Sequence, residues 1–309
     1  MKSTLKSSLK EAVAGYLFVM PNFLGFLVFT SLPVVASFFI AFFQWDLITE
    51  PKFVGLENFI NLLSFHHENG AIVSNDPDFW KFLGNTFFLM LGIPLNMAAS
   101  LILAVIMNKK LKGIVIFRTV YFLPSICAGV AIYMLWQWIY NPDFGLLNTL
   151  IRKLSFGIFN GPEWLTSTAW AKPALILMGV WTTMGGYNMI LYLAGLQGIP
   201  PELYEAAAID GASPWQKFRH VTWPMLTPTT FFIFIMSMIA GFQGGFEQAY
   251  IMTGGGPAGS TTTIEYYIFN NVYVWQHMGY AASIAWILFV IIFVINLFIW
   301  KYGGKVVHY

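Results

Sequence analysis

The chain has 309 residues, of which 57% are hydrophobic and only 10% charged, with a mean hydropathy of +0.65 and a net charge of +2. An ordinary soluble domain carries about 25% charged residues. The composition therefore excludes a soluble globular protein, and the small positive charge does not indicate a nucleic-acid partner.

The charged residues leave six long windows that contain no charge. A helix needs about 20 apolar residues to cross a bilayer core, so each window is long enough for one crossing and too short for two. Segments of this length indicate helices, because membrane strands would be shorter and would alternate. We therefore predict an all-α polytopic membrane protein with six transmembrane helices. The predicted spans are residues 16–43, 82–108, 117–140, 173–193, 225–247 and 280–300.

The basic residues set the orientation of these spans. If the N-terminus lies inside, eleven Lys and Arg residues fall on the cytoplasmic side and five outside, and the densest cluster is Lys109, Lys110 and Lys112. Basic residues in short loops favour the cytoplasm. Both termini are therefore predicted to be cytoplasmic, as tails 1–15 and 303–309 on either side of one six-helix membrane domain, 16–302.

The start of the chain resembles a signal peptide, with basic residues before an apolar stretch. The stretch from Tyr16 to Phe43 is too long for a signal core, and no Ala-x-Ala site follows it, so we interpret it as a retained anchor. Cys127 is the one cysteine, which excludes a disulfide framework, and it is expected to be a small buried residue of the third span.

Two longer segments are predicted outside the membrane. Residues 44–78 contain a polar stretch from His66 to Pro77 that is expected to form a flexible tip. His66 and His67 could suggest a metal site, but adjacent histidines point in different directions, which favours a solvated loop. The second segment, 141–168, is rich in turn residues.

Polar residues inside spans are costly unless they face a cavity or a partner, so they are candidates for a solute pathway. Amides, a carboxylate and aromatic faces are groups that bind sugars. The alternatives are helix–helix hydrogen bonds, interfacial anchoring, and packing at Gly241 and Gly245, which have GxxxG spacing. The candidates in the fourth and fifth spans are Trp181, Tyr187, Asn188, Gln243, Glu247 and Tyr250.

The cytoplasmic segment 194–224 is predicted to form two short helices joined by a glycine. Pro201 opens the first helix, and Gly211 ends it in the left-handed conformation. Ser213, Pro214 and Gln216 then form a capping box for the second. Residues 194–216 contain no Lys or Arg, which disfavours a membrane-surface helix and favours a protein partner.

Glycines occur at positions 254, 256 and 259 with the spacing of a dinucleotide fingerprint. No predicted strand precedes them, so a tight external loop at the pathway mouth is the better interpretation. The chain has no Gly-Lys-Ser/Thr sequence, so it lacks a Walker loop, and ATP hydrolysis would have to come from a partner.

The cytoplasmic segment closely resembles the EAA loop of ABC importer permeases. The matching residues are Glu205-Ala206-Ala207, then Gly211 after three residues, then Val221-Thr222-Trp223-Pro224 after nine. Val221 and Trp223 depart from the family pattern, and both are interpreted as anchors of the second helix. Further stretches, such as Met252-Thr253-Gly254-Gly255-Gly256-Pro257, resemble the MalF-like, sugar-type branch, so the resemblance covers residues 16–302.

The resemblance implies the type I ABC importer permease fold in a bacterial cytoplasmic (inner) membrane. It implies a transport subunit and not an enzyme, usually paired with a second, related permease chain in a heterodimer. Two ATP-binding subunits would hold ATP and Mg²⁺, so this chain would need no cofactor, and an extracytoplasmic binding protein would deliver a sugar. The residues expected to contact the ATPase are Glu202, Leu203, Tyr204, Glu205, Ala206, Ala207, Asp210 and Gly211.

Three alternatives remain beside this interpretation. The permease could carry a non-sugar solute. Half of a secondary transporter would usually show an inverted repeat or ion-coupling residues within the spans, which offer at most Glu247. An intramembrane enzyme would need a nucleophile and a base together, and His220 and His277 have no such partners at triad or ligand spacing.

Overall fold

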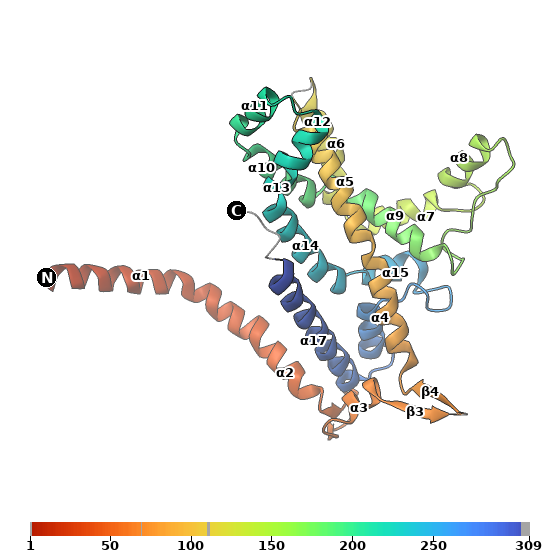
Figure 1. The fold of residues 1–309 in the computed structure, drawn as a ribbon. Helices are drawn as coiled ribbons and strands as arrows, with labels where there is room; N and C mark the ends of the chain where they lie inside the picture. The colour runs from red at the N-terminus through yellow and green to blue at the C-terminus, as the bar shows by residue number, and fades with distance from the viewer. Residues whose placement is uncertain (1, 69, 110–111, 304–309) are drawn as a thin grey trace. The chain divides into compact units, whose positions relative to one another are not determined.

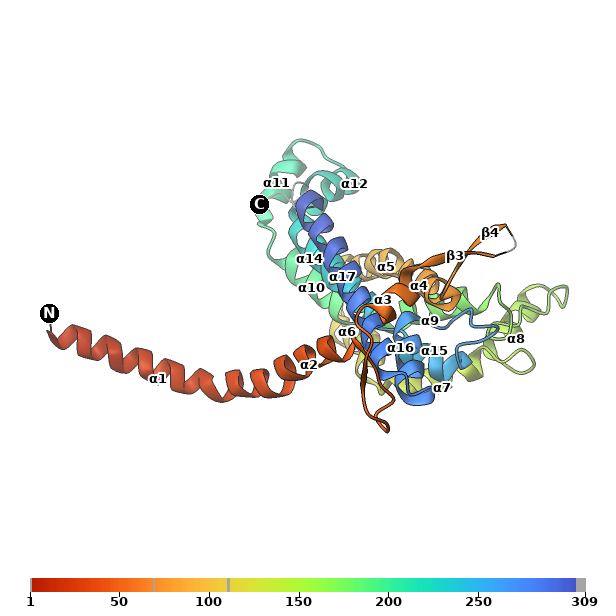
Figure 2. The same ribbon diagram turned by 90° about the horizontal axis from the view of Figure 1, so that it is seen from below.

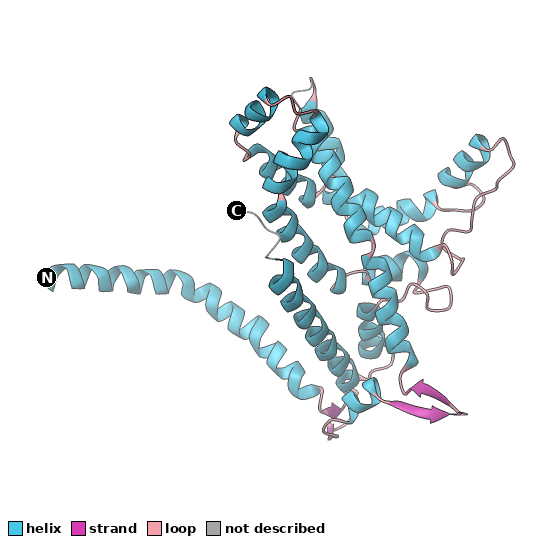
Figure 3. Cartoon of the chain, viewed as in Figure 1, coloured by secondary structure: helices cyan, strands magenta, loops and turns pink. Residues whose placement is uncertain are grey.

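The computed structural model describes residues 2–68, 70–109 and 112–303, which form two compact units. One unit comprises Met1–Asn75 and Ile268–Ile287, and the other comprises Asp76–Tyr267 and Leu288–Tyr309. Helices dominate both units, and the few strands are short (Figure 3). Lys110 of the predicted basic cluster and nearly all of the predicted tail, residues 304–309, lie outside the described residues.

The first unit begins with a long apolar helix. Helix α1 (Lys2–Phe26), the π-helical turn η1 (Leu27–Ser31) and α2 (Leu32–Ile40) follow one another without a gap (Figures 1 and 2). Pro33 lacks the N–H that an α-helix would direct back by one turn, which accounts for the wider turn just before it. Of the predicted span 16–43, residues 16–40 thus lie in this helix, which ends at Ile40. The helix also includes residues 2–15 of the predicted tail.

A β-hairpin occupies the place where a flexible tip was expected. Strands β3 (Phe65–Glu68) and β4 (Ala71–Ser74) pair in antiparallel register, with Phe65 opposite Ser74. The hairpin closes at its base because His66 Nδ1 and Asn75 Oδ1 lie 2.7 Å apart. The preceding segment holds β1 (Phe43–Gln44) paired with β2 (Lys52–Phe53), and then α3 (Glu57–Leu63).

The second unit contains the helices that surround the sites described below. In chain order they are α4 (Pro77–Met90), α5 (Gly92–Met107), α6 (Ile114–Ile126), α7 (Gly129–Ile139), α8 (Leu146–Leu154), α9 (Ala171–Thr183), α10 (Tyr187–Gln197), α11 (Pro201–Ile209), α12 (Pro214–Lys217), η2 (Phe218–Thr222), α13 (Trp223–Met225), α14 (Thr227–Phe242) and α15 (Phe246–Thr253). Helix α16 (Ile264–Phe269), the turn η3 (Asn270–Val274) and α17 (Met278–Gly303) are the last elements of the described residues.

Six segments of the described chain are compatible with crossing a membrane. Three are helices of sufficient length and apolarity, at Lys10–Ile40, Pro77–Met107 and Met278–Gly303. The other three are bent helix pairs, α6 with α7, α9 with α10, and α12 and α13 with α14, at angles of 98°, 47° and 62°. If each bent pair is one span, the number equals the six that the sequence predicts.

Cys127 is exposed in this chain, so the expectation that it is buried was wrong. It ends α6, with φ −71° and ψ +150°, at the 98° bend before Gly129. None of the residues of α6 is buried in this chain, so the residue at its end is exposed like the helix before it, which a count of apolar residues does not reveal.

The bend between α9 and α10 is packed closely against α6. A Cβ atom on Gly185 would overlap the carbonyl oxygen of Tyr121, and one on Gly186 would lie 3.0 Å from the Cβ of Ser125. Helices in a membrane associate where small residues let backbones approach. The two glycines therefore allow the contact that holds this bend in place.

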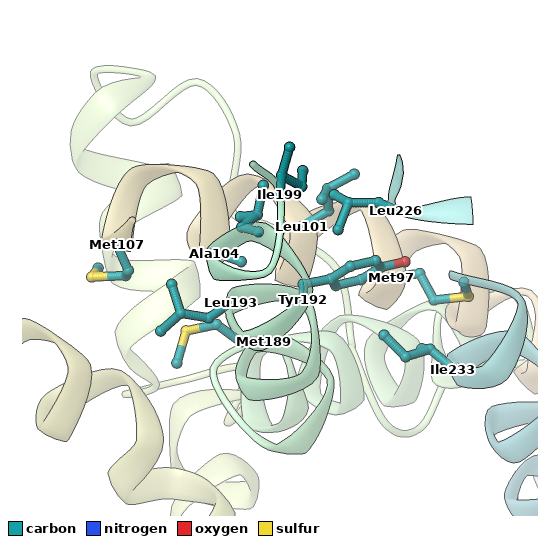
Figure 4. Packing of buried hydrophobic residues seen from close by; sticks show 11 residues of the cluster. Met97, Leu101, Ala104, Met107, Met189, Tyr192, Leu193, Ile199, Leu226 and Ile233 are labelled. Carbon is teal, nitrogen blue, oxygen red and sulfur yellow. The ribbon is translucent and has the colours of Figure 1, made fainter. Parts of the chain in front are cut away.

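Helices α5, α10 and α14 share the main apolar cluster of the second unit. Figure 4 shows its side chains, with Tyr192, Leu226 and Ile233 among those that are nearly inaccessible. A Cβ atom on Gly195 would lie 2.9 Å from Leu226 Cδ2, so this glycine permits close contact between α10 and the start of α14. This cluster fixes the helix ends from which segment 194–224 extends.

The fifth predicted span, 225–247, does not form one helix. Helix α14 ends at Phe242, and Gly245 has φ +91° before α15 begins. Gly241 packs near Met90 and Ile93, as a small residue at an interface would. The GxxxG interpretation fails for Gly245, because the two glycines do not share a helix face.

Candidate functional site

The first candidate site is the predicted contact segment, which has the form that the sequence indicates. Helix α11 ends at a left-handed Gly211, with φ +75°. The N–H of Ala212 donates to the carbonyl of Ala207 at 2.9 Å, which satisfies a helix-terminal acceptor. The predicted elbow between two short helices is confirmed.

Helix α12 starts with the predicted capping box. Ser213 N–H donates to Gln216 Oε1 at 2.7 Å, and Gln216 N–H donates to Ser213 Oγ at 3.4 Å. Both bonds satisfy backbone groups that a helix start would leave without partners. The second short helix therefore has a fixed starting point two residues after the elbow.

Tyr204 attaches α11 to the rest of the unit. Its hydroxyl lies 2.9 Å from the hydroxyl of the buried Thr222, and its ring packs on the apolar cluster of Figure 4. Val221 packs on the same cluster, as expected of an anchor, whereas Trp223 is 42% exposed and does not fit that interpretation. Both ends of the segment are thus joined to one packed core.

The other predicted contact residues form an accessible surface on α11 and the elbow. Glu202, Leu203, Glu205, Ala206, Asp210 and Gly211 are exposed, and Ala207 is half-buried. Ile209 was not among the predicted residues, yet it is 87% exposed on the same helix. An isoleucine on a helix that is predicted to be cytoplasmic, away from the face of Tyr204, was the signal that could have identified it.

The second candidate site is a cavity of about 600 Å³ that lies within the second unit. Most of its wall comes from α4, α5, α9, α10 and α14 and from the residues between α14 and α15. Most of the exposed surface of this wall is apolar. The polar residues in it are Thr86, Asn96, Ser125, Thr183, Tyr187, Asn188, Ser237, Gln248 and Thr263.

Three of these polar residues form a hydrogen-bonded group that links α5 to the bent pair. Asn96 on α5 donates to the hydroxyl of Thr183 at the end of α9. Asn188 on α10 donates to Asn96 Oδ1 at 3.1 Å, and Ser100 donates to the same oxygen at 3.2 Å. One amide thus contacts both sides of the α9–α10 bend.

Two of the six predicted pathway residues, Tyr187 and Asn188, line this cavity. The other four lie elsewhere. The ring of Trp181 packs edge-on against the ring of Trp136, with centroids 5.4 Å apart, and the ring of Tyr250 stacks on that of Phe246, with centroids 5.5 Å apart. Gln243 and Glu247 are exposed, Gln243 after the end of α14 and Glu247 in the first turn of α15.

Asn96 is the residue of this cavity that the sequence interpretation missed. It lies in the second predicted span, where an amide among apolar residues carries the same signal as Asn188. Thr183 and Gln248 also line the cavity, and both belong to the polar runs, Trp181-Thr182-Thr183 and Gln243 to Gln248, from which the sequence candidates were taken.

Known proteins resemble this chain over nearly its full length. Residues 96–301 match the family model described as "binding-protein-dependent transport system inner membrane component". The chain is 38% identical to the probable ABC transporter permease protein YesP of Bacillus subtilis (strain 168), over 98% of this chain and 94% of that protein. It is 36% identical to the lactose transport system permease protein LacF of Rhizobium radiobacter, over 96% of each.

A solved structure has a similar arrangement of helices. A chain of a bacterial ABC transporter involved in the import of the acidic polysaccharide alginate aligns with 99% of this chain and 100% of its own length, with a TM-score of 0.81 and 22% identity. At this identity the likeness establishes a shared fold and nothing about the solute.

Proposed function

Because the chain belongs to the family of binding-protein-dependent transport system inner membrane components, we propose that it carries a mono-, di- or oligosaccharide into the cell as the permease subunit of an ATP-driven importer. Membership makes it a transport subunit of the inner membrane and not an enzyme. The fold is the predicted type I ABC importer permease fold. The proposal that the solute is a sugar rests on the 36% identity to a lactose permease over 96% of both chains.

In the proposed complex this chain pairs with a second permease chain. Two ATP-binding subunits bind ATP and Mg²⁺ on the cytoplasmic side, and a solute-binding protein docks outside. The six bent or continuous apolar segments span the membrane with both termini in the cytoplasm, which is supported by the eleven basic residues on that side.

Helix α11 is the proposed contact with one ATP-binding subunit. Its exposed residues, with Glu202 and Glu205 near the positive N-terminal end of the helix dipole, offer a small, mostly smooth surface. Tyr204 and Val221 connect this surface to the core, so movement of the docked subunit is transmitted to α10 and α14. A binding event at a remote site thereby biases a two-state membrane element.

The proposed solute pathway includes the polar cavity with Tyr187 and Asn188. Trp181, Gln243, Glu247 and Tyr250 are proposed to border its outer part, although they do not line the cavity of this chain. A 600 Å³ space has the size of a small-molecule site, and its aromatic and amide groups suit a sugar.

Transport by the reconstituted complex tests this function. The chain is coexpressed with its cognate second permease and ATPase, purified, and placed in proteoliposomes with the binding protein. We expect uptake of a radiolabelled sugar only when ATP is supplied on the ATPase side. Glu205→Arg is expected to leave the protein in the membrane and abolish uptake, because it reverses a charge on the docking surface. Accumulation along an ion gradient without ATPase would contradict the proposal.

A further inference from the structure

The cavity has an uncharged wall. Among its lining residues, all of which belong to the described part of the chain, none is Lys, Arg, His, Asp or Glu. A carboxylate that leaves water needs a cation or several N–H donors in exchange for its hydration. The wall that this chain contributes offers no such cation.

Two polar groups of the wall, those of Ser125 and Gln248, donate a hydrogen to the backbone of the chain itself. The Ser125 hydroxyl donates to the carbonyl of Phe122 at 2.7 Å, and Gln248 Nε2 donates to the carbonyl of Leu175 at 2.7 Å. A carbonyl can only accept, so the direction of both bonds is fixed by chemistry. The Ser125 oxygen and Gln248 Oε1 are then the groups that can accept hydrogen bonds from a solute.

The same reasoning fixes the orientation of the Asn96 amide. The hydroxyl of Thr183 donates to the carbonyl of Gly179 at 2.7 Å, and it has only one hydrogen. Its oxygen must therefore accept from Asn96, which places Nδ2 of Asn96 toward Thr183. The carbonyl of Gly179 thus determines the orientation of the Asn96 amide. This carbonyl is three hydrogen bonds away from Asn188 along the network.

Asn188 is oriented in turn. Because Asn96 Oδ1 is an acceptor, Asn188 must present Nδ2 to it, at 3.1 Å. The Oδ1 atom of Asn188 is at the other end of the amide and is available to a solute in the cavity that Asn188 lines. Asn96 acts here as a positioning residue.

We propose that this cavity selects an uncharged, polyhydroxylated solute, whose hydroxyl groups donate to oxygen acceptors that include Asn188 Oδ1, and that it excludes acidic saccharides. This inference rests on the proposed function. It separates this chain from the alginate importer that shares its fold, whose cargo is an acidic polysaccharide. An acidic saccharide would bring a carboxylate against a wall that supplies no cation to replace its hydration.

Matched solutes test the selection directly. The complex of this chain with its second permease and ATPase, in lipid nanodiscs without binding protein, is titrated calorimetrically at millimolar concentration with galactobiose and digalacturonate, and with mannobiose and dimannuronate. We expect the neutral member of a pair to bind about tenfold more tightly or better, which corresponds to one lost hydrogen bond to an anion or more. Equal or tighter binding of the acidic member would overturn the inference.

Variants at Asn188 locate the selection. Asn188→Ala should weaken binding of the neutral solute about tenfold, while Asn160→Ala, in an exposed loop, should leave it unchanged. Asn188→Lys should bind the acidic member more tightly than the wild type does, a gain that a misfolded protein cannot produce. If the lysine variant binds no acidic member more tightly, Asn188 does not face the solute.

Variants at Asn96 test positioning. Asn96→Leu lets the Asn188 amide turn, so the preference for the neutral over the acidic member should shrink, whatever happens to stability. An unchanged preference in the leucine variant would exclude the positioning role.

Uptake distinguishes this inference from the proposed function. ATP-driven uptake of acidic saccharides in preference to neutral ones would refute the proposed selectivity of the cavity without contradicting the proposed importer function. Uptake that needs no ATPase would refute the importer itself.

Discussion

The hydroxyl oxygens of Tyr204 and Thr222 lie 2.9 Å apart and join the exposed helix α11 to the π-helical turn before α14. They are 18 residues apart in sequence. Since the ring of Tyr204 also packs on the core, this contact couples a surface helix to two membrane-associated helices.

Tyr204→Phe should uncouple ATP hydrolysis from transport in part. The change removes one hydrogen bond, worth about 0.5–1.5 kcal/mol, and keeps the packing of the ring. We expect a complex that assembles normally but transports less solute per ATP hydrolysed. Thr222→Val should give the same loss, and the double variant no further loss. Additive losses would mean that the two hydroxyls act separately.

Gly211→Ala should destabilise the elbow although its side chain meets nothing within 4 Å. The backbone has φ +75°, which costs an alanine roughly 1 kcal/mol. ATPase binding to the detergent-solubilised permease should weaken accordingly. Gly198→Ala is the control, because Gly198 has φ −81° and room for a methyl group. Equal effects of the two changes would remove the conformational explanation.

Ser213→Ala should reduce the stability of α12 by about 1 kcal/mol, which is the usual contribution of an N-cap side chain. Hydrogen exchange at the amide of Gln216, which donates to the Ser213 side chain, measures this locally. Ser213→Asp should restore protection, since aspartate caps equally well. Protection that does not change in the alanine variant would show that the cap contributes nothing.

Gly185→Ala should prevent normal packing of the α9–α10 bend, because the added Cβ would overlap the carbonyl of Tyr121. We expect a low yield of monodisperse protein and a reduced melting temperature. Gly84→Ala in α4 has open space and should be tolerated or slightly stabilising. A wild-type melting temperature for Gly185→Ala would mean that the bend can relax at little cost.

Cysteine labelling tests the predicted topology. In a Cys127→Ser background, Lys153→Cys should react with a membrane-impermeant maleimide in intact cells. Lys217→Cys should react only after permeabilisation, because it lies on the predicted cytoplasmic side. The opposite pattern would invert the orientation and place α11 outside.

The sequence by itself determined the local features of this protein. The absence of charge over six windows predicted the apolar segments, and the short-range chemistry of Pro201, Gly211, Ser213 and Gln216 predicted both helices of the cytoplasmic segment. Such features depend on residues within one helical turn of each other, so spacing alone reveals them.

Only the tertiary structure decided which polar residues meet. Asn96, Thr183 and Asn188 come from three helices and converge where α9 and α10 bend, while Gln243 and Glu247 lie outside the cavity because α14 ends at Phe242. The structure also leaves Cys127 exposed, at the end of a helix that has no buried residue. Helix breaks depend on close contacts such as that of Gly185 with Tyr121, 64 positions apart in sequence, and hydropathy does not record them.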